Sequence, residues 1–156
     1  MSDSRPYRVL VVCTGNTCRS AMAEALLQRM LDEAGVPAEV RSAGTSASDG
    51  APAHLHAREV AAERGLDLSG HASQSLTEDL MRWADTVLCM TRSHVRYALD
   101  LDSAADVRLV SELGGPGGGE GVRDPIGYDR EVYEDVFEEI RAHLEPFVES
   151  NQGSSV

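Results

Sequence analysis

The sequence predicts an α/β domain of three layers, in which a short four-stranded parallel sheet lies between two layers of helices. Two observations predict this class. Short apolar runs of strand length alternate along the chain with longer segments of helical periodicity. Most of the apolar runs are followed by a polar or glycine-containing loop and then by a helical segment, which is the order found in βαβ units. With 156 residues, the chain is long enough for one such domain with its own core.

The first half of the chain is expected to hold two strand–helix pairs. The apolar run over 8–12 predicts the first strand, and apolar residues at helical spacing predict a helix over 21–34 that ends before a glycine. A short second strand is expected over 40–43, ending at a glycine. A helix is expected over 52–64, with these residues facing inward: Leu55, Val60 and Ala61.

The second half continues the alternation. Thr77 has the character of a helix N-cap and predicts a short helical segment to residue 84, before a buried strand over 86–90. A helix over 93–100 and a strand over 107–110 follow. The last helix is expected over 129–148, with one apolar face formed by Val132, Val136, Ile140, Leu144 and Phe147. The domain is therefore expected to span 7–149, with disordered ends at 1–6 and 150–156.

Composition and charge exclude several function classes. A formal net charge of −12 argues against a nucleic-acid partner, because phosphate backbones require basic surfaces. No apolar run has the length of a membrane span, and the first residues lack the apolar core of a signal peptide. Three unevenly spaced cysteines do not form a disulfide scaffold. We therefore expect a cytoplasmic protein that does not bind membranes. A monomer is expected, although the sequence does not determine the oligomeric state.

One segment has the features of a phosphate-binding catalytic loop. It runs from Cys13 to Ser20, directly after the first predicted strand, and a helix begins at its end. Free backbone N–H groups and the helix dipole at such a place favour both a thiolate and a phosphate dianion. Arg19 adds a planar set of donors suited to phosphate oxygens. The spacing Cys-x5-Arg-Ser predicts a nucleophilic Cys13, with the binding loop completed by Thr14, Gly15, Asn16, Thr17, Cys18 and Ser20.

A second segment supplies a candidate acid. A cysteine that accepts a phosphoryl group needs another residue to protonate the leaving atom. Asp124 precedes a proline in a loop expected near the carboxyl edge of the sheet, where parallel sheets bind ligands. The glycine-rich stretch 114–121 just before it has no strand-to-helix arrangement, so we expect a mobile connector there. The histidines at 54 and 56 lack the spacing of a helical metal pair, and no metal site is predicted.

Together these segments resemble the low-molecular-weight protein tyrosine phosphatase family. The matching stretches are 12–20, 41–45, 70–74 and 124–125, in the family's order. The resemblance implies the Rossmann-like phosphotyrosine phosphatase I fold with strand order 2-1-3-4 and no cofactor. It also implies Cys13 as nucleophile, Arg19 as phosphate clamp and Asp124 as general acid. A hydrogen-bonded scaffold that holds the loop is implied for Asn16, Ser42 and His71.

The substrate is expected to be a phosphorylated protein, with phosphoarginine favoured over phosphotyrosine. Ile126 and Gly127 stand where tyrosine-specific members of the family carry aromatic residues. Thr17 resembles the threonine of the bacterial protein-arginine phosphatases, where tyrosine-specific members carry isoleucine. The basic guanidine leaving group would depend strongly on an acid such as Asp124. A tyrosine phosphatase remains the alternative, and Thr17 and Ile126 are the residues expected to select the substrate.

Cys18 and Cys89 bear on two further hypotheses. Cys18 is close enough in sequence to Cys13 to form a disulfide under oxidation, which the family resemblance also suggests. Arsenate reductases share the fold and loop, but they pass oxidation to further cysteines, and the remaining Cys89 lies within a buried strand without a nearby partner. A non-catalytic phosphate-binding or redox-sensing module is a third alternative, but it would have no use for Asp124.

Overall fold

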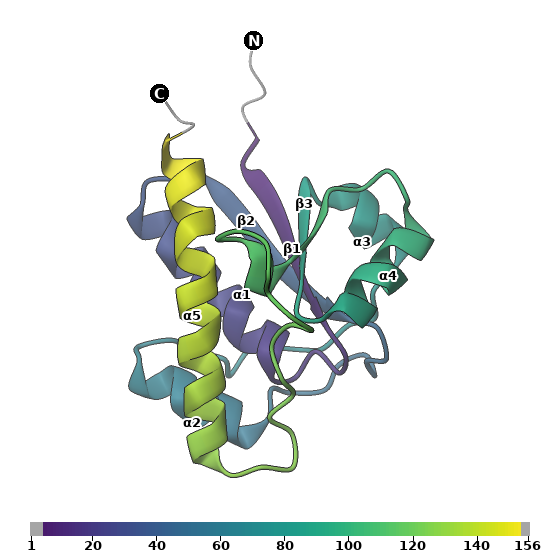
Figure 1. The fold of residues 1–156 in the computed structure, drawn as a ribbon. Coiled ribbons are helices and arrows are strands. Elements are labelled where there is room, and N and C mark those ends of the chain that lie inside the picture. Colours follow the sequence, from purple (N-terminus) through teal and green to yellow (C-terminus); the bar gives the residue numbers. More distant parts are fainter. Residues whose placement is uncertain (1–4, 154–156) are drawn as a thin grey trace.

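The computed structural model describes residues 5–153 and contains a four-stranded parallel sheet of order β2-β1-β3-β4 (Figure 1). This is the strand order that the family resemblance implied. The register of β1 and β2 places Cys13, the last residue of β1, beside Gly44, the last residue of β2. Two candidate segments of the site therefore meet at one edge of the sheet. The strands are β1 (Tyr7–Cys13), β2 (Ala38–Gly44), β3 (Thr86–Cys89) and β4 (Val107–Leu109).

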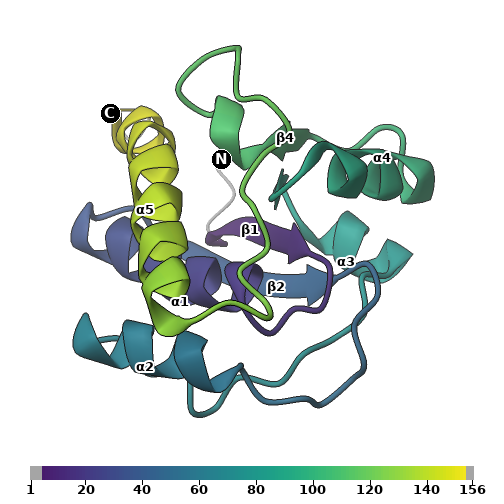
Figure 2. The ribbon, with the colours of Figure 1, turned by 60° about the horizontal axis from the view of Figure 1, so that its bottom comes forward.

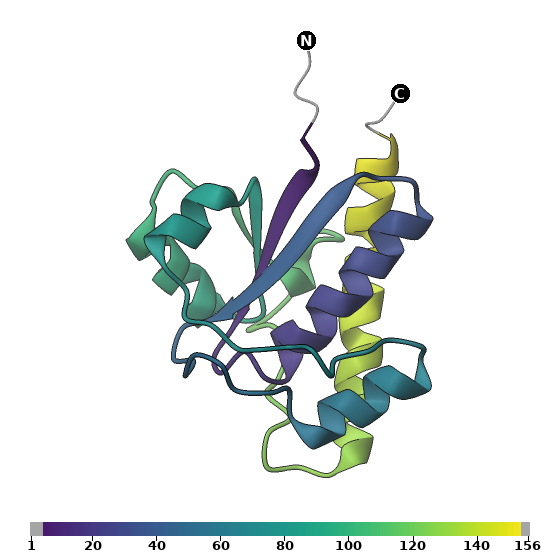
Figure 3. The ribbon, with the colours of Figure 1, turned by 180° about the vertical axis from the view of Figure 1, so that it is seen from behind.

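Helices cover both faces of the sheet (Figure 2). On one face α1 (Arg19–Glu33) and α5 (Arg130–Gly153) lie side by side, and α2 (Leu55–Glu63) packs against both of them. On the other face lie α3 (Glu78–Trp83) and α4 (Arg92–Leu101). Seen from behind, α1 and α5 run along the sheet, whereas α2 lies across their lower ends (Figure 3). The predicted three-layer architecture is confirmed.

From Val9 to Cys13, strand β1 is apolar because it is buried on both of its faces. Val9, Val11 and Cys13 belong to the larger core, which they share with α1 and α5. Leu10 and Val12 belong to the smaller core, on the side of α3 and α4. Side chains alternate across a strand, so a central parallel strand with helices on both sides requires apolar residues at every position. The position of Cys13 on the α1 side follows from this alternation.

Helix α2 differs from its prediction in two ways. It begins at Leu55 instead of residue 52, because His54 is its N-cap and His54 Nδ1 accepts a hydrogen bond of 3.1 Å from the N–H of His56. The expectation that Leu55 faces inward was wrong, since 53% of this residue is exposed. The first turn of α2 is thus held by a cap, and its buried face begins later, at Ala57, Val60 and Ala61.

The structure is more regular than predicted at both ends of the described chain. Arg5 forms a 2.8 Å ion pair with Asp85, so the expected disorder over 1–6 does not extend to it. Helix α5 continues to Gly153, so the prediction of a disordered tail from residue 150 was wrong for 150–153. Ser150 Oγ and Asn151 Nδ2 both donate to the carbonyl of Phe147, at 3.0 and 2.8 Å, which continues the helix. The remainder of both predicted ends lies outside the described residues.

The glycine-rich stretch is tied down at several points. Arg92 Nε donates to the carbonyl of Gly119 at 2.7 Å, and Ser111 Oγ donates to that of Gly118 at 2.8 Å. Gly121 pairs with Thr91 in an isolated antiparallel bridge. Gly121 has φ of +114°, and a Cβ there would lie 2.0 Å from a backbone oxygen at the end of β3, so glycine is required. The expected mobile connector is thus anchored to α4, and it leads directly to Asp124.

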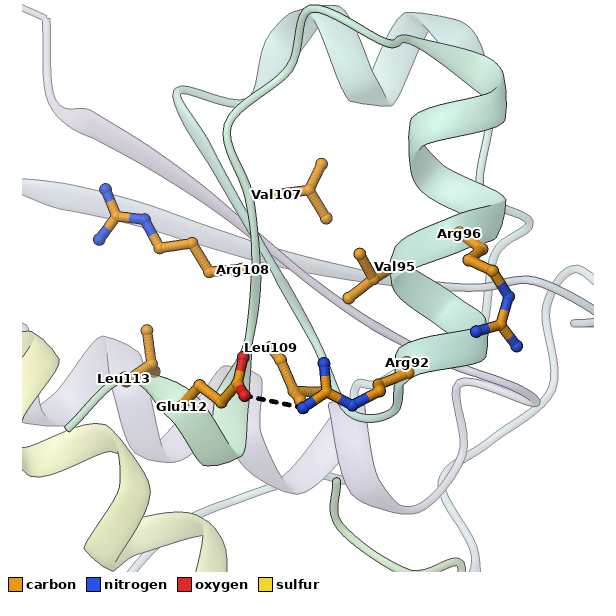
Figure 4. A pocket seen from close by; sticks show the side chains of 8 residues that line it. All are labelled: Arg92, Val95, Arg96, Val107, Arg108, Leu109, Glu112 and Leu113. Atoms are coloured by element: carbon orange, nitrogen blue, oxygen red, sulfur yellow. Dashed lines mark hydrogen bonds and ion pairs between the residues drawn. The ribbon is translucent and has the colours of Figure 1, made fainter. Parts of the chain in front are cut away.

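Arg92 also forms one wall of a pocket of about 510 Å³. This pocket lies between α4, β4 and the 3-10 turn Val110–Glu112, and the Arg92–Glu112 ion pair of 2.7 Å closes one end of it (Figure 4). None of the predicted site residues lines it. The pocket therefore does not compete with the cysteine loop as the candidate catalytic centre.

Candidate active site at the cysteine loop

Cys13, the predicted nucleophile, lies at the junction of β1, a five-residue loop and α1. Cys13 is buried, and its Sγ lies 2.8 Å from Ser20 Oγ in the first turn of α1. Cys18 is the N-cap of this helix, and no side chain of the described residues caps its first turn. The N–H groups of the helix start therefore remain available to an anion, as the sequence predicted. A hydroxyl next to the sulfur is positioned to stabilise negative charge there.

Asn16 lies at the centre of the loop and holds it with four hydrogen bonds. Its Nδ2 donates to Ser20 Oγ at 2.8 Å and to Ser42 Oγ at 2.9 Å. Its Oδ1 accepts from the backbone N–H of Gln74 at 2.9 Å, and its carbonyl oxygen lies 2.6 Å from His71 Nε2. Its φ is +59°, the one left-handed value among the non-glycine residues of 5–153. Asparagine tolerates this conformation better than most residues.

The contacts of Asn16 join the three segments that the family resemblance singled out. Ser42 belongs to β2, and its hydroxyl in turn donates to Glu24 of α1. His71 and Gln74 come from the segment that follows α2. The predicted scaffold residues Asn16, Ser42 and His71 therefore lie together, although only Asn16 touches both of the others.

Arg19 is buried, with 4% of its surface exposed, and its charge is incompletely paired. Its Nη1 donates to the carbonyl of Val122 at 2.9 Å. Its Nη2 lies 3.4 Å from Thr14 Oγ1 and 3.6 Å from Asp124 Oδ2. Its Nε is buried without a hydrogen-bond partner in the described chain. Because an unsatisfied buried donor is costly, this open N–H next to the cysteine indicates a place for an anion.

Asp124 lies at the mouth of the site, with 44% of its side chain exposed. One carboxylate oxygen accepts the N–H of Ile126 at 3.0 Å, and Ile126 itself is 53% exposed. A small pocket joins these residues to the thiol, and no aromatic residue lines it. Its lining consists of Cys13, Gly15, Thr17, Cys18, Arg19, Asp124 and Ile126.

The other two cysteines differ sharply from each other. Cys18 borders the same pocket, and its Sγ lies 3.5 Å from the hydroxyl of the buried Tyr133. Burial raises the pKa of the Cys18 thiol, while the hydrogen bond from Tyr133 opposes this shift. Cys89 is fully buried in the smaller core, and burial raises the pKa of its thiol to about 12. Cys89 is therefore not placed to relay oxidation in the manner of an arsenate reductase.

The structure adds site residues that the sequence interpretation missed. The ring of His94 lies against the loop, with its Nε2 2.9 Å from Thr14 Oγ1. Tyr133 contacts Cys18 and stacks on His54, with ring centroids 5.1 Å apart. The spacing from Thr91 to His94 at a helix start was the available signal, since it forms a capping box directly after a strand. Nothing in the sequence singled out Tyr133 as a site residue, because its position in α5 matches that of any other core residue of the helix.

Within residues 5–153, no three histidine, cysteine or acidic side chains are grouped so that they could hold a metal ion. No helix in the same range is long and apolar enough to cross a membrane.

A thiol at the end of a parallel strand, facing a helix N-terminus and a buried arginine with an open donor, defines an α/β protein with a cysteine-based anion-binding loop. A family model described as low molecular weight phosphotyrosine protein phosphatase matches residues 8–154. The chain belongs to this family of cysteine-based protein phosphatases.

Several relatives that match most of the chain are named as arginine phosphatases. A protein named protein-arginine-phosphatase from Geobacillus stearothermophilus is 37% identical over 94% of this chain and 97% of its own length. Its namesake from Bacillus subtilis is 38% identical over 87% of this chain and 91% of its own. The solved YwlE arginine phosphatase from Geobacillus stearothermophilus has a TM-score of 0.85 at 34% identity, over 96% of this chain and 95% of that one.

Proposed function

We propose that this protein removes phosphoryl groups from phosphorylated proteins through a cysteinyl-phosphate intermediate, with phosphoarginine as the preferred substrate. The observation that supports this chemistry is that Cys13, Arg19 and Asp124 line the same small pocket. A nucleophile, a cationic clamp and an acid are the three groups that metal-free phosphoryl transfer requires.

In the first half-reaction, the Cys13 thiolate attacks phosphorus in line with the leaving atom. The S–P bond forms while the P–N or P–O bond breaks, and Asp124 delivers its proton to the departing nitrogen or oxygen. Arg19 Nε, which has no partner in the described chain, and the loop N–H groups hold the equatorial oxygens. Ser20 Oγ, at 2.8 Å from the sulfur, stabilises the thiolate before attack and when it is released.

In the second half-reaction, water replaces the leaving group. The Asp124 carboxylate accepts a proton from the water as its oxygen attacks phosphorus, and the S–P bond breaks to return the Cys13 thiolate and inorganic phosphate. Asp124 has the exposure that this exchange of leaving group for water needs. The acid is thus reset for the next turnover.

The preference for phosphoarginine rests on the walls of the pocket. Phosphotyrosine is usually gripped between aromatic or large apolar faces. Here Thr17 and Ile126 form the walls, and no aromatic ring contributes. The two named arginine phosphatases match 94% and 87% of this chain, and the tyrosine phosphatases AmsI from Erwinia amylovora and Wzb from Escherichia coli match 83% of it. Phosphotyrosine remains the second candidate, because the family contains both kinds of enzyme.

The test is a comparison of kcat/KM on matched phosphoarginine and phosphotyrosine peptides, with Thr17→Ile measured beside the wild type. We expect the wild type to favour phosphoarginine and Thr17→Ile to move the ratio toward phosphotyrosine. A wild type that favours phosphotyrosine would refute the substrate class while leaving the mechanism intact. Cys13→Ser is the control for the mechanism, and any remaining turnover by it would refute the thiol as nucleophile.

We further propose that Cys18 protects Cys13 from irreversible oxidation. Peroxide oxidises the Cys13 thiolate to a sulfenic acid, and the Cys18 sulfur then attacks it with loss of water to give the disulfide. Both cysteines border the same pocket. Because burial raises the pKa of Cys18, little of it is thiolate, and its direct oxidation by peroxide is disfavoured.

A further inference from the structure

The ring of His94 connects the start of α4 to the phosphate loop. His94 is 4% exposed and is the third residue of α4, where it closes a capping box with Thr91. The backbone N–H of Thr91 donates to His94 Nδ1 at 3.1 Å. On the other side of the ring, Nε2 lies 2.9 Å from Thr14 Oγ1. The two nitrogens therefore face two different segments of the chain.

These contacts fix the tautomer of His94. Since Nδ1 accepts an N–H, it carries no proton, and in the neutral ring the proton is on Nε2. Burial lowers the pKa of His94 to about 4, with the charge of Arg19 acting in the same direction and that of Asp124 opposing it, so the ring is neutral near pH 7. His94 Nε2–H consequently donates to Thr14 Oγ1, and never accepts from it.

The orientation of Thr14 matters because its hydroxyl oxygen is a partner of Arg19. Arg19 Nη2 lies between two acceptors, Thr14 Oγ1 at 3.4 Å and Asp124 Oδ2 at 3.6 Å. If the guanidinium turned toward Asp124, the two side chains would form an ion pair. Arg19 would then be unavailable to phosphate, and Asp124 would be unavailable as an acid. When His94 holds the Thr14 hydroxyl in place, two acceptors fix the orientation of the Arg19 guanidinium: the Thr14 hydroxyl oxygen and the carbonyl oxygen of Val122.

We propose that His94 is a positioning residue for the phosphate clamp, acting through Thr14 to hold the Arg19 guanidinium in its phosphate-binding orientation and apart from Asp124. The proposal rests on the proposed phosphatase function and extends it to a residue outside the loop. His94 touches neither the thiol nor the substrate site, since it does not line the pocket of Cys13. Its effect therefore passes through the hydrogen bonds of Thr14.

Two isosteric substitutions of His94 separate its two contacts. The amide of asparagine occupies the place of Nδ1 and can cap α4, but it cannot reach Thr14. Glutamine places its NH2 group near the position of Nε2 and can still donate to Thr14. We expect His94→Asn to lower kcat about tenfold or more with a smaller change in KM, and His94→Gln to recover most of this loss. His143→Asn, at a partly exposed position of α5 away from the loop, is the matched control for loss of a histidine.

A double-mutant cycle tests the route through Thr14. Thr14→Val removes the hydroxyl but keeps the shape, and we expect it to lower kcat as much as His94→Asn does. The double variant should cost no more than either single one, because both break the same connection. Costs that simply add, or a His94→Asn enzyme as active as the wild type, would overturn the proposal.

Affinity for inorganic phosphate, measured by calorimetry, separates this proposal from the proposed function. We expect His94→Asn and Thr14→Val to weaken phosphate binding to the same extent, again without additivity. A wild type that binds phosphate but does not turn over phosphopeptides would refute the phosphatase function, while the binding cycle would still decide the role of His94. Phosphate affinity that is unchanged in both variants would overturn the role of His94 whatever the activity. Thermal unfolding of each variant excludes loss of fold as the cause.

Discussion

Gly44 lies directly against the carbonyl oxygen of Thr14, and the space between them is too small for a methyl group. A Cβ at Gly44 would lie 2.3 Å from that oxygen and 2.9 Å from the side chain of Ala47. The contact holds because the residues after Gly44 bond to the loop: the N–H groups of Thr45 and Ser46 donate to the carbonyls of Cys13 and Thr14, at 2.9 and 3.0 Å. The end of β2 thus serves as the floor of the phosphate loop.

Replacing Gly44 with alanine should therefore deform the loop. We expect Gly44→Ala to destabilise the protein by about 1–3 kcal/mol and to lower kcat/KM by at least tenfold, since the backbone of Thr14 must move. Urea unfolding and peptide kinetics measure the two effects. Gly70→Ala is the matched control, because nothing lies within 4 Å of a Cβ at that position. Equal behaviour of the two variants would contradict the role given to the end of β2.

Asn16 allows its backbone and side-chain contributions to be separated. Asn16→Gly keeps the left-handed conformation accessible but removes the side-chain bonds to Ser20, Ser42 and Gln74. Asn16→Ala loses the same bonds and adds about 1 kcal/mol of backbone strain. We expect both to lower kcat by about tenfold or more, with alanine the less stable in thermal unfolding. An alanine variant as stable as the glycine variant would show that the loop relaxes out of the left-handed state.

The dependence on the acid should follow the leaving group. We expect Asp124→Asn to lower kcat by about a hundredfold or more on phosphoarginine peptides, because the guanidine must be protonated as it leaves. The loss should be smaller on an aryl phosphate with an acidic phenol, which departs as an anion. Steady-state kinetics on both substrates provide the comparison. The same loss on both would argue that Asp124 acts on a step other than leaving-group departure.

Mild oxidation should join Cys13 to Cys18 and leave Cys89 untouched. The thiol of Cys89 has a pKa of about 12 and no access to solvent, so it does not form the reactive thiolate. Peptide mass spectrometry after peroxide treatment detects the disulfide, and activity should return with a dithiol reductant. In Cys18→Ser we expect the sulfinic and sulfonic forms of Cys13 instead. Oxidised wild type without the disulfide would rule out the protective role of Cys18.

Acid should lower the free energy of unfolding, in part through protonation of His94. Its folded-state pKa of about 4 lies below its ordinary value of 6.5, so between these pH values the unfolded chain binds the proton and the folded one does not. The stability contributed by the neutral ring is complete above about pH 6.5 and is lost as pH falls toward 4. From pH 7.5 to 5 we expect wild type to lose about 2 kcal/mol more unfolding free energy than His94→Gln. Parallel pH dependence of the two proteins would contradict a buried neutral His94.

Much of the fold, and the position of Cys13 and Arg19 around one loop, could be predicted because the signals are local. A run of apolar residues that is buried on both faces marked β1, and the loop after it placed Cys13 and Arg19 at a helix start. The contact between His94 and Thr14 could not be predicted in this way, since it joins residues 80 apart in sequence whose separate patterns suggest only a cap and a loop residue. The prediction that Leu55 faces inward was wrong for a related reason. Helical periodicity does not reveal that the first turn of α2 lies outside the face that packs against the core.

The hydrogen bond from Arg19 to the carbonyl of Val122 has a consequence for engineering this enzyme. Because this carbonyl, two positions before Asp124, holds the Arg19 guanidinium, the start of the Asp124 loop cannot be exchanged between family members without moving Arg19. The residues over 126–129, between Pro125 and the start of α5, are solvent-exposed, with Ile126 at 53% and Tyr128 at 60%. Loop segments exchanged to alter the substrate range should therefore begin after Pro125. Val122 should be kept in every such variant, because its carbonyl holds Arg19.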